Sequence, residues 1–317
     1  MKKSDELFPE TIQLTLRREN IMRYGENPHQ NAAFYTVDRE NSLFKQIQGK
    51  KELSYNNMLD VHAAWSIPNE FLNPTVAIIK HCTPCGIATC NNLVSAFNKA
   101  LACDSLSAFG SIIAANRLVD VDLLKAIGRL FVEVIVAPSF TKDALAYLSR
   151  KKKNCRVLVP TTTSIPKFEF RNVAGGFLVQ ESDTNNICCG EWRVVTERQP
   201  TDSESKDMLF ADKAVKFVRS NGIVIAKNCA TVGIGGGQTS RVDAVNQAIL
   251  QAGDNSTGGS LGSDAFFPFP DGIESAAKAG ITAIIQPGGS KRDSEVIEAA
   301  NNLGIAMIFT GMRHFKH

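Results

Sequence analysis

The segment from Thr75 to Gly86 has the sequence TVAIIKHCTPCG. Its first five residues form a short, apolar and partly β-branched run, and a turn with proline and glycine follows, which is typical of a buried strand. Similar runs are predicted as strands at Ile112–Ala115, Val132–Ala137, Ile223–Ala226, Ile281–Ile285 and Ala306–Phe309. Helical spacing lies between them, at Leu93–Leu101, Leu123–Leu130, Thr141–Leu148, Met208–Val218, Val242–Leu250, Ile273–Ala279 and Glu295–Leu303. This alternation predicts an α/β protein with a largely parallel sheet.

The sequence around this segment is repeated later in the chain. Ile79-Lys80-His81-Cys82 recurs as Ala226-Lys227-Asn228-Cys229, and two further pairs of motifs follow in the same order. The separations are 147 residues for Lys80 and Lys227, 148 for Ala96 and Ala244, and 149 for Pro138 and Pro287. A common order and a nearly constant separation predict two copies of one α/β unit. Chance similarity between short apolar strands is the alternative.

We divide the chain accordingly. Residues 1–145 are predicted to form the first unit with an N-terminal extension, and residues 211–317 the second. Between them, 146–210 is predicted to be a connecting subdomain, which contains the charge run Arg150-Lys151-Lys152-Lys153 and the polar stretch Gln199–Lys206. A lysine run of this kind is usually a solvated face.

The composition restricts the class of protein. The 317 residues are 44% hydrophobic, which is enough for the cores of about two domains. The 35 basic and 32 acidic residues give a net charge of +3, which is too balanced for a nucleic-acid-binding surface. No apolar run approaches the roughly 20 residues of a membrane span, and no leader peptide is recognisable. We therefore expect a cytoplasmic protein whose eight cysteines are reduced thiols.

His81-Cys82-Thr83-Pro84-Cys85 has the spacing of half a zinc site. A structural site needs a second pair of ligands, and the only other close cysteines, Cys188 and Cys189, are adjacent and lack the two-residue spacer. The sequence therefore predicts buried thiols and no zinc.

Two glycine-containing loops are candidates for binding an anion. Val232–Gln238 lacks the third glycine of a dinucleotide-binding loop, but its glycines would let backbone amides approach a ligand, with Arg241 nearby to meet an anion. A tight hairpin without a ligand is the alternative. Pro287-Gly288-Gly289-Ser290-Lys291-Arg292 follows a strand and precedes a helix, where α/β sheets usually bind ligands. An ordinary solvated loop is the alternative there.

Lys80 and His81 form a candidate acid–base pair. Neighbouring strand residues point to opposite faces, so the two side chains can serve one site only if the strand ends at this point. If they meet, an imidazole can take up a proton near neutral pH and a partly desolvated lysine can donate one. A surface position without function is the alternative reading of this pair.

Several stretches of the sequence, in order from about residue 20 to the last residue, closely resemble the AICAR transformylase domain of the PurH family of bifunctional purine enzymes. The stretches are Arg23-Tyr24-Gly25-Glu26-Asn27-Pro28-His29-Gln30, Lys80-His81 with Pro84 and Gly86, Asp104–Gly110, Ser263–Phe269 and Arg313–His317. The resemblance implies a fold of duplicated cytidine-deaminase-like three-layer α/β/α units joined by extra elements. It also implies an enzyme that has no zinc and that works as a homodimer with its active site at the subunit interface.

The resemblance further implies the roles of particular residues. Lys80, His81 and Asn221 match catalytic positions. Substrate-binding positions are matched by Arg23, Tyr24, Gly110, Glu133, Arg241, Phe266, Arg313 and His317, with Glu133 standing where some members have aspartate. Val242, Ser290 and Lys291 match positions near the folate.

The expected activity is transfer of the formyl group of 10-formyltetrahydrofolate to the 5-amino group of AICAR. The family's cyclohydrolase half is absent from the sequence, so ring closure is not expected of this chain. A bound monovalent cation is compatible with the sequence. Two rival readings remain, a zinc-dependent deaminase or hydrolase on the same fold and a non-catalytic ligand sensor. The sensor is disfavoured because Lys80, His81, Asn221, Arg23 and Arg313 are all present.

Overall fold

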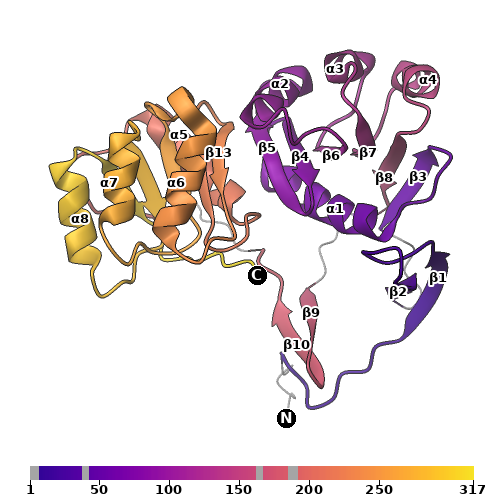
Figure 1. Ribbon diagram of the computed structural model, residues 1–317, viewed down its shortest axis with the longest axis horizontal. Helices are drawn as coiled ribbons and strands as arrows, with labels where there is room; N and C mark the ends of the chain where they lie inside the picture. Colours follow the sequence, from indigo (N-terminus) through magenta and orange to yellow (C-terminus); the bar gives the residue numbers. More distant parts are fainter. Residues whose placement is uncertain (1–6, 38–42, 162–166, 185–191) are drawn as a thin grey trace, which may run out of the picture.

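The computed structural model describes residues 7–37, 43–161, 167–184 and 192–317. Most of the described chain forms two six-stranded sheets, each with helices on both faces (Figure 1). The first sheet has the strand order β3 (Phe44–Gln48), β8 (Arg156–Pro160), β7 (Val132–Val136), β6 (Ser111–Ala115), β4 (Thr75–Lys80) and β5 (Thr83–Thr89). The second has the order β11 (Arg193–Val194), β16 (Ala306–Phe309), β15 (Ala283–Gln286), β14 (Ser260–Ser263), β12 (Ile223–Ala226) and β13 (Thr231–Gly235).

The two sheets are copies of one unit, which confirms the duplicated fold. In each unit an outer strand leads to one helix, a hairpin follows, and three helices alternate with three parallel strands. The hairpin strands and the outer strand run antiparallel to their neighbours, so each sheet is mixed and not largely parallel. Strands β4 and β12 each run antiparallel to the first parallel strand of their unit. Each hairpin turn therefore lies at the edge of the sheet where the parallel strands begin.

Helices cover both faces of each sheet, which gives the three layers. In the first unit α1 (Tyr55–Ser66) lies on one face, and α2 (Leu93–Cys103), α3 (Val121–Ile127) and α4 (Lys142–Lys151) lie on the other (Figure 1). In the second unit α5 (Asp202–Val215) lies on one face, and α6 (Arg241–Ala252), α7 (Asp271–Lys278) and α8 (Asp293–Asn302) lie on the other. No described helix is long and apolar enough to cross a membrane.

A single hydrophobic core joins the units. The α1 face of the first sheet and the α5 face of the second contribute to the same cluster of buried side chains, in which the rings of Phe71 and Phe210 are 5.2 Å apart. The edge strand β5 also meets the second unit through a bridge between Ala88 and Ala230, the residue that precedes β13. A buried ion pair of 3.5 Å between Glu70 and Lys216 crosses the same interface.

Parts of the segment 146–210 belong to the two sheets. Strand β8 completes the first sheet, whereas β11 and α5 begin the second unit. Of the residues between β8 and β11, those in 167–184 contain a two-stranded hairpin, β9 (Phe168–Val173) and β10 (Gly176–Glu181).

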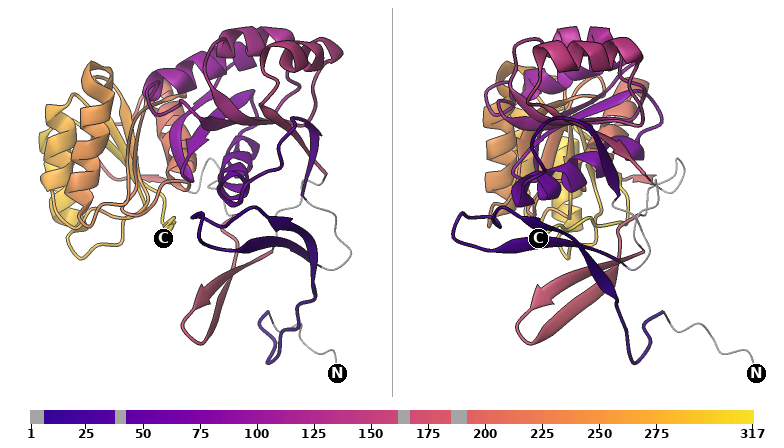
Figure 2. Two further views of the ribbon diagram at one scale, coloured as in Figure 1. Left: turned by 45° about the vertical axis from the view of Figure 1, so that its right-hand side comes forward. Right: turned by 90° about the vertical axis from the view of Figure 1, so that its right-hand side faces the viewer.

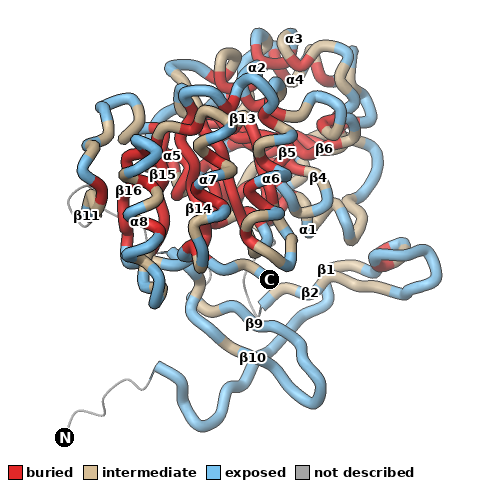
Figure 3. Tube along the Cα trace, turned by 60° about the vertical axis from the view of Figure 1, so that its left-hand side comes forward, coloured by how far each residue is buried: buried red, intermediate tan, exposed pale blue. Residues whose placement is uncertain are grey.

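Two hairpins project from the body of the molecule. The β9–β10 hairpin and the hairpin of β1 (Leu16–Met22) and β2 (Ala32–Val37) extend away from the sheets on the same side (Figure 2). Their side chains are mostly exposed, in contrast to the buried strands of the sheets (Figure 3). Several of these exposed side chains are apolar: Leu16, Ile21, Tyr35, Val37, Phe170, Phe177 and Leu178.

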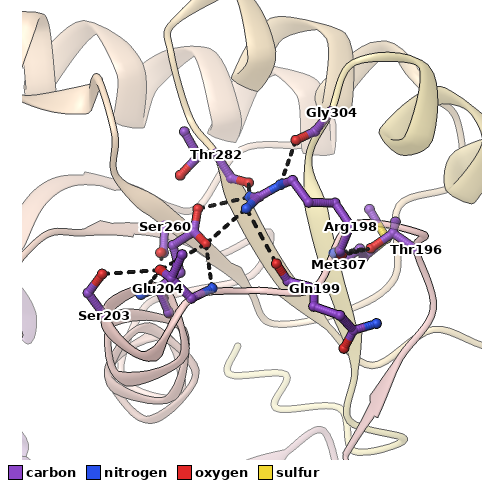
Figure 4. Close-up of polar contacts among 10 residues, drawn as sticks. Thr196, Arg198, Gln199, Ser203, Glu204, Ser260, Thr282, Gly304 and Met307 are labelled. Carbon is purple, nitrogen blue, oxygen red and sulfur yellow. Dashed lines mark hydrogen bonds and ion pairs between the residues drawn. The ribbon is translucent and has the colours of Figure 1, made fainter.

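The start of α5 is fixed to the second sheet by an ion-pair network (Figure 4). Thr201 and Glu204 form a capping box, in which each side chain accepts from the backbone of the other. Arg198 makes two hydrogen bonds to Glu204, of 2.8 and 3.1 Å, and donates to the carbonyls of Thr282 and Gly304. The network therefore links the cap of the helix to the segments that precede β15 and β16.

Candidate active site

Strands β4 and β5 are joined by a two-residue turn that carries His81. Lys80 pairs with Thr83, and the two residues between them, His81 and Cys82, have φ of 53° and 58°. Positive φ at both positions is the signature of a type I′ turn, which usually contains asparagine or glycine. Side chains other than these adopt this region at a cost and do so most often at functional sites. The Cys82 amide donates to Asp60 Oδ1 at 2.6 Å, which holds the turn against α1.

Lys80 is the last residue of β4, and its side chain lies along the edge of the sheet where β6 begins. Its Nζ donates to the carbonyl of Phe109 at 2.8 Å, next to Gly110. The amide of Gly110, which has φ of 78°, donates to the carbonyl of Phe131, so β6 and β7 begin beside Lys80. Because the strand ends at Lys80, the alternation of strand side chains does not separate Lys80 from His81. The structure therefore brings Lys80, His81 and Gly110 to one edge of the first sheet.

Glu133, the second residue of β7, lies along the same edge but is already paired. Its carboxylate accepts from Arg156 on β8, whose Nε also donates to the carbonyl of Glu52. The side chain of Glu133 keeps one third of its surface exposed. Sequence reasoning did not identify Arg156, because β8 is 23 residues further along the chain and no motif marks it.

The second unit repeats the turn without the histidine. Asn228 and Cys229 both have φ of 53°, and both amides donate to the carboxylate of Asp207. Lys227 Nζ donates to the carbonyl of Thr257 at 2.8 Å, as Lys80 does to Phe109. The duplication has therefore preserved the lysine, the cysteine and the supporting aspartate, and imidazole occurs in the first copy alone.

Asn221 and Arg241, predicted from distant motifs, are in direct contact in the second unit. Arg241 donates to Asn221 Oδ1 at 2.8 Å and to Asp264 Oδ1 at 2.6 Å. Asn221 Nδ2 donates to the carbonyls of Gln238 and Thr239. Asp264 is fully buried and also accepts from Ser220 Oγ. Arg241 therefore pairs with an anionic side chain of the protein, whereas the sequence analysis predicts that it meets an anionic ligand.

The C-terminal segment lies against the loop that carries Asn221. The amide of Lys316 donates to Ser220 Oγ, and the amide of Ser220 donates to the carbonyl of Lys316. The guanidinium of Arg313 lies 4.4 Å from the ring centre of Phe315, and the rings of Phe315 and His317 are 5.6 Å apart. The structure therefore brings Arg313 and His317 to the same side of the second unit as Asn221.

The turn of the first unit lies within electrostatic reach of this segment. Burial raises the pKa of the Cys82 thiol to about 11, with a further contribution from Asp60, while the charges of Lys316 and Arg219 lower it. Cys82 and Phe217 also pack on the same core, and Lys316 Nζ lies 5.7 Å from the ring centre of Phe217. The edge that carries His81 therefore faces the loop before Asn221.

The loop after β15 differs from the expectation of free amides. The amides of Gly289 and Ser290 donate to the carboxylate of Asp293, at 2.7 and 3.1 Å, so they are not available to an anion. The charge of Lys291 remains beside this turn. Arg292 lies over the ring of Phe269, in the loop that also contains the partly exposed Phe266.

The remaining glycine loop is also closed by the protein itself. Gly236 N donates to the side chain of Gln247, and Gly237 N donates to the carbonyl of Arg219. The segment is therefore not a hairpin: it is the end of β13 and the turn into α6, and the amides of Gly236 and Gly237 are engaged within the protein. Val242, the second residue of α6, is half-buried next to Arg241.

Arg23 and Tyr24 follow β1, where the guanidinium lies 5.4 Å from the tyrosine ring centre. Their loop is held to α1 by a hydrogen bond from Asn56 to the carbonyl of Glu26. Within 7–37, 43–161, 167–184 and 192–317, no hydrogen bond, ion pair or ring contact joins Arg23 or Tyr24 to the other predicted site residues.

The described residues contain no group of three or more histidine, cysteine, aspartate or glutamate side chains that could hold a metal ion. Burial raises the pKa of Cys85, in β5, to about 12, so this thiol is neutral at physiological pH. Cys188 and Cys189 lie outside the described residues.

Sequence comparisons are consistent with this geometry. A family model described as AICARFT/IMPCHase bienzyme matches residues 1–251. Proteins named bifunctional purine biosynthesis protein PurH are 52% identical over 99% of this chain in Persephonella marina, 50% over 98% in Acetivibrio thermocellus and 48% over 98% in Listeria monocytogenes serotype 4b. The chain spans 62% of the length of each of these relatives. It belongs to the AICARFT/IMPCHase bienzyme family of purine biosynthesis enzymes.

Proposed function

We propose that this chain is an AICAR formyltransferase, which moves the formyl group of 10-formyltetrahydrofolate to the 5-amino group of AICAR to give FAICAR. The observation that carries the proposal is the Lys80–His81 turn, in which an ammonium group and an imidazole lie at one sheet edge. The ammonium group donates to the carbonyl of Phe109, and Asp60 holds the backbone of the turn through the amide of Cys82. The proposal includes no IMP cyclohydrolase activity.

His81 is the proposed base. The amino group of AICAR is a poor nucleophile because the ring carboxamide withdraws electrons, so a proton must leave as the nitrogen attacks the formyl carbon. Among the described residues, the only hydrogen bond recorded for His81 is the one its carbonyl accepts from Thr83 Oγ1. The imidazole is therefore free of protein partners there, and it is exposed at the tip of the turn.

Lys80 is the better candidate for stabilising the oxyanion that forms on the formyl oxygen. An ammonium group has three N–H donors, and Lys80 uses one of them on Phe109. Asn221 has two side-chain donors, and both are engaged by Gln238 and Thr239. Lys80 can thus donate to the oxyanion without losing a bond and can pass a proton to the departing folate nitrogen. Asn221 is better suited to orienting Arg241.

Arg313 and Arg23 are the proposed ligands of the substrate phosphate, because a guanidinium can donate two parallel hydrogen bonds to it. Arg241 is less suited to this role, since Asp264 already compensates its charge. Tyr24, Gly110, Glu133, Phe266 and His317 are proposed to contact the nucleotide. Val242, Ser290 and Lys291 are proposed to lie near the folate, and a monovalent cation remains compatible with these roles.

We propose that the active form is a homodimer. The groups at the His81 edge and the groups around Asn221 lie on different units, and no hydrogen bond recorded among the described residues joins His81 to Asn221, Arg241 or Arg313. The two hairpins project on one side of the molecule (Figure 2). Several of their apolar side chains are exposed. A second copy of the chain would cover these side chains.

A spectrophotometric assay tests the proposed function. The purified chain is mixed with AICAR and 10-formyltetrahydrofolate, and the release of tetrahydrofolate is followed by absorbance. We expect turnover that depends on both substrates and that disappears when formate replaces the folate donor. Binding of AICAR without turnover would instead favour a ligand sensor, and one tightly bound zinc ion per chain would favour a hydrolase.

A further inference from the structure

We propose that Asp264 is a positioning residue, which sets the geometry of the Asn221 loop, the Arg241 side chain and the C-terminal segment at once. This inference rests on the proposed function. Asp264 directly follows β14, and its side chain is fully buried. It lies within the Ser263–Phe269 stretch, but the motif alone indicates no role for it.

The two carboxylate oxygens of Asp264 have different partners. Oδ1 accepts from Arg241 NH1 at 2.6 Å, and the side chain of Arg241 is itself only 6% exposed. Oδ2 accepts from Ser220 Oγ, in the residue before Asn221. Since the other terminal nitrogen of Arg241 donates to Asn221 Oδ1, the carboxylate orients Asn221 both through Arg241 and through Ser220.

The backbone of Asp264 also binds the C-terminal segment. Its amide donates to the carbonyl of Gly222 at 3.1 Å, and its carbonyl accepts from the amide of His314 at 2.9 Å. The ring of His314 is buried and contacts Asp183 at 2.7 Å. The Arg313–His317 segment is therefore anchored to Asp264 through His314, and to its partner Ser220 through Lys316.

The first unit shows that a carboxylate is not needed for the fold at this position. The residue that directly follows β6, the counterpart of β14, is Asn116. Its amide side chain accepts from Thr75 N and donates to three carbonyls of the chain that leads into β4, those of Pro68, Phe71 and Asn73. A neutral amide is sufficient there, because the first copy has no arginine to orient. The carboxylate of the second copy therefore serves the Arg241–Asn221 arrangement.

Two substitutions test the proposal. In Asp264→Asn, the buried guanidinium of Arg241 loses its counter-charge. The amide nitrogen either faces Arg241, which removes that hydrogen bond, or faces Ser220, whose hydroxyl must then accept where it now donates. Ser220→Ala removes the second partner and leaves no buried charge unpaired. Ser256→Ala is the control, because Ser256 is more deeply buried than Ser220 and its hydroxyl donates to two carbonyls, those of Gly253 and Ala279, on another loop.

The readouts are steady-state formyl transfer and cleavage of the C-terminal segment by trypsin. We expect kcat to fall at least 30-fold in Asp264→Asn and about 10-fold in Ser220→Ala, with KM for the folate within twofold. Cleavage after Arg313 should become at least 10-fold faster in both variants. Ser256→Ala should change neither kcat nor the rate of tryptic cleavage, even if it lowers the thermal midpoint as much as Ser220→Ala does.

The outcomes separate this proposal from the proposed function. Absence of turnover in the unaltered chain would refute the formyltransferase assignment, and tryptic cleavage would still test whether Asp264 anchors the segment. Unchanged cleavage and unchanged kcat in a folded Asp264→Asn variant would overturn the role of Asp264. If Asp264→Asn does not fold, Ser220→Ala decides the question, and equal effects of Ser220→Ala and Ser256→Ala would overturn the proposal.

Discussion

Replacing His81 by asparagine removes the imidazole while keeping a residue that this chain already accommodates in the same turn. Asn228 occupies the equivalent position in the second unit, with the same φ of 53°. The amide of the following cysteine donates to an aspartate in both units, to Asp60 in the first and to Asp207 in the second. We therefore expect His81→Asn to fold with a thermal midpoint within about 2 °C of the unaltered chain, since the replaced side chain is exposed and asparagine adopts this backbone conformation in the second unit. Formyl transfer should fall by about 100-fold or more, as is typical for loss of a general base.

The reciprocal change, Asn228→His, is the matched control for this prediction. It places an imidazole in the second turn, where Lys227 is also present, and it should leave the transfer rate unchanged. Normal turnover in His81→Asn would remove His81 from the mechanism. If both variants melt at the same temperature as the unaltered chain, a loss of formyl transfer in His81→Asn is due to the missing imidazole and not to unfolding of the turn.

Single residues also show what the sequence could and could not predict. Lys80 and His81 are adjacent in the chain, so the motif places them together, and β4 ends at Lys80, which is the condition that a shared site requires. Asp60 and Asp264 were not recognised, because their partners Cys82 and Arg241 lie 22 and 23 residues away and the contacts form only in the folded chain. A carboxylate whose role is to hold another residue has no local signature in a single sequence.

Among the elements, α5 offers a pH-dependent test of the network at its first turn. Burial alone would raise the pKa of Glu204, but hydrogen bonds from Arg198, Thr282 and Thr201 lower it from 4.5 to about 2. A carboxyl group whose folded-state pKa is depressed stabilises the protein above its unfolded pKa, and this contribution is lost as the pH falls towards the folded value. Because solvent screens part of these interactions, Glu204→Gln should lower the free energy of unfolding by about 1–2 kcal/mol at pH 7.

Urea denaturation of the Glu204→Gln variant and of the unaltered chain at several pH values measures this contribution. The difference between the two proteins should be constant from pH 7 to about pH 5 and should shrink between pH 4.5 and pH 2. Lys125 and Asp122 form an exposed pair on α3, so Asp122→Asn provides a control that we expect to cost less than about 1 kcal/mol at any of these pH values. A difference for Glu204→Gln that does not depend on pH would contradict the network.

Two of the strands that the sequence does not predict have a composition that serves close packing. Strands β5 and β13 contain Pro84, Gly86, Gly233 and Gly235, which weaken any sequence pattern typical of strands. A Cβ atom on Gly86 or on Gly235 would overlap the carbonyl of a residue in α2 or α6, respectively. These glycines let a helix lie directly on an edge strand, which is a tertiary requirement. The apolar helices α2 and α6, in contrast, begin within one residue of their predicted positions.

At the scale of the whole molecule, we expect a homodimer of about 69 kDa, twice the chain mass of 34.5 kDa. Phe177 and Leu178 on β10 are 68% and 62% exposed, so changing both to serine should not destabilise the single chain. The double variant should shift sedimentation towards the single-chain mass and lower transfer at micromolar concentrations.

Leu250→Ser on α6 is the control for this experiment, because that leucine is more exposed still and lies on a single helix outside the projecting hairpins. A single-chain mass for the unaltered protein at concentrations where it is fully active would contradict the dimer. Loss of helical circular dichroism in the double variant would show instead that the hairpin supports the fold of one chain.

The hydrophobic core that joins the two units has a consequence for synthesis on the ribosome. The first sheet is complete when Pro160 has been added, but its α1 face packs with side chains as late as Ile234. At about 5–20 residues per second, the intervening residues take roughly 4 to 15 s to emerge. During that interval a nascent chain with one finished sheet exposes apolar surface that only its own second half can cover, and it is then a substrate for chaperones that bind unfolded or partly folded chains.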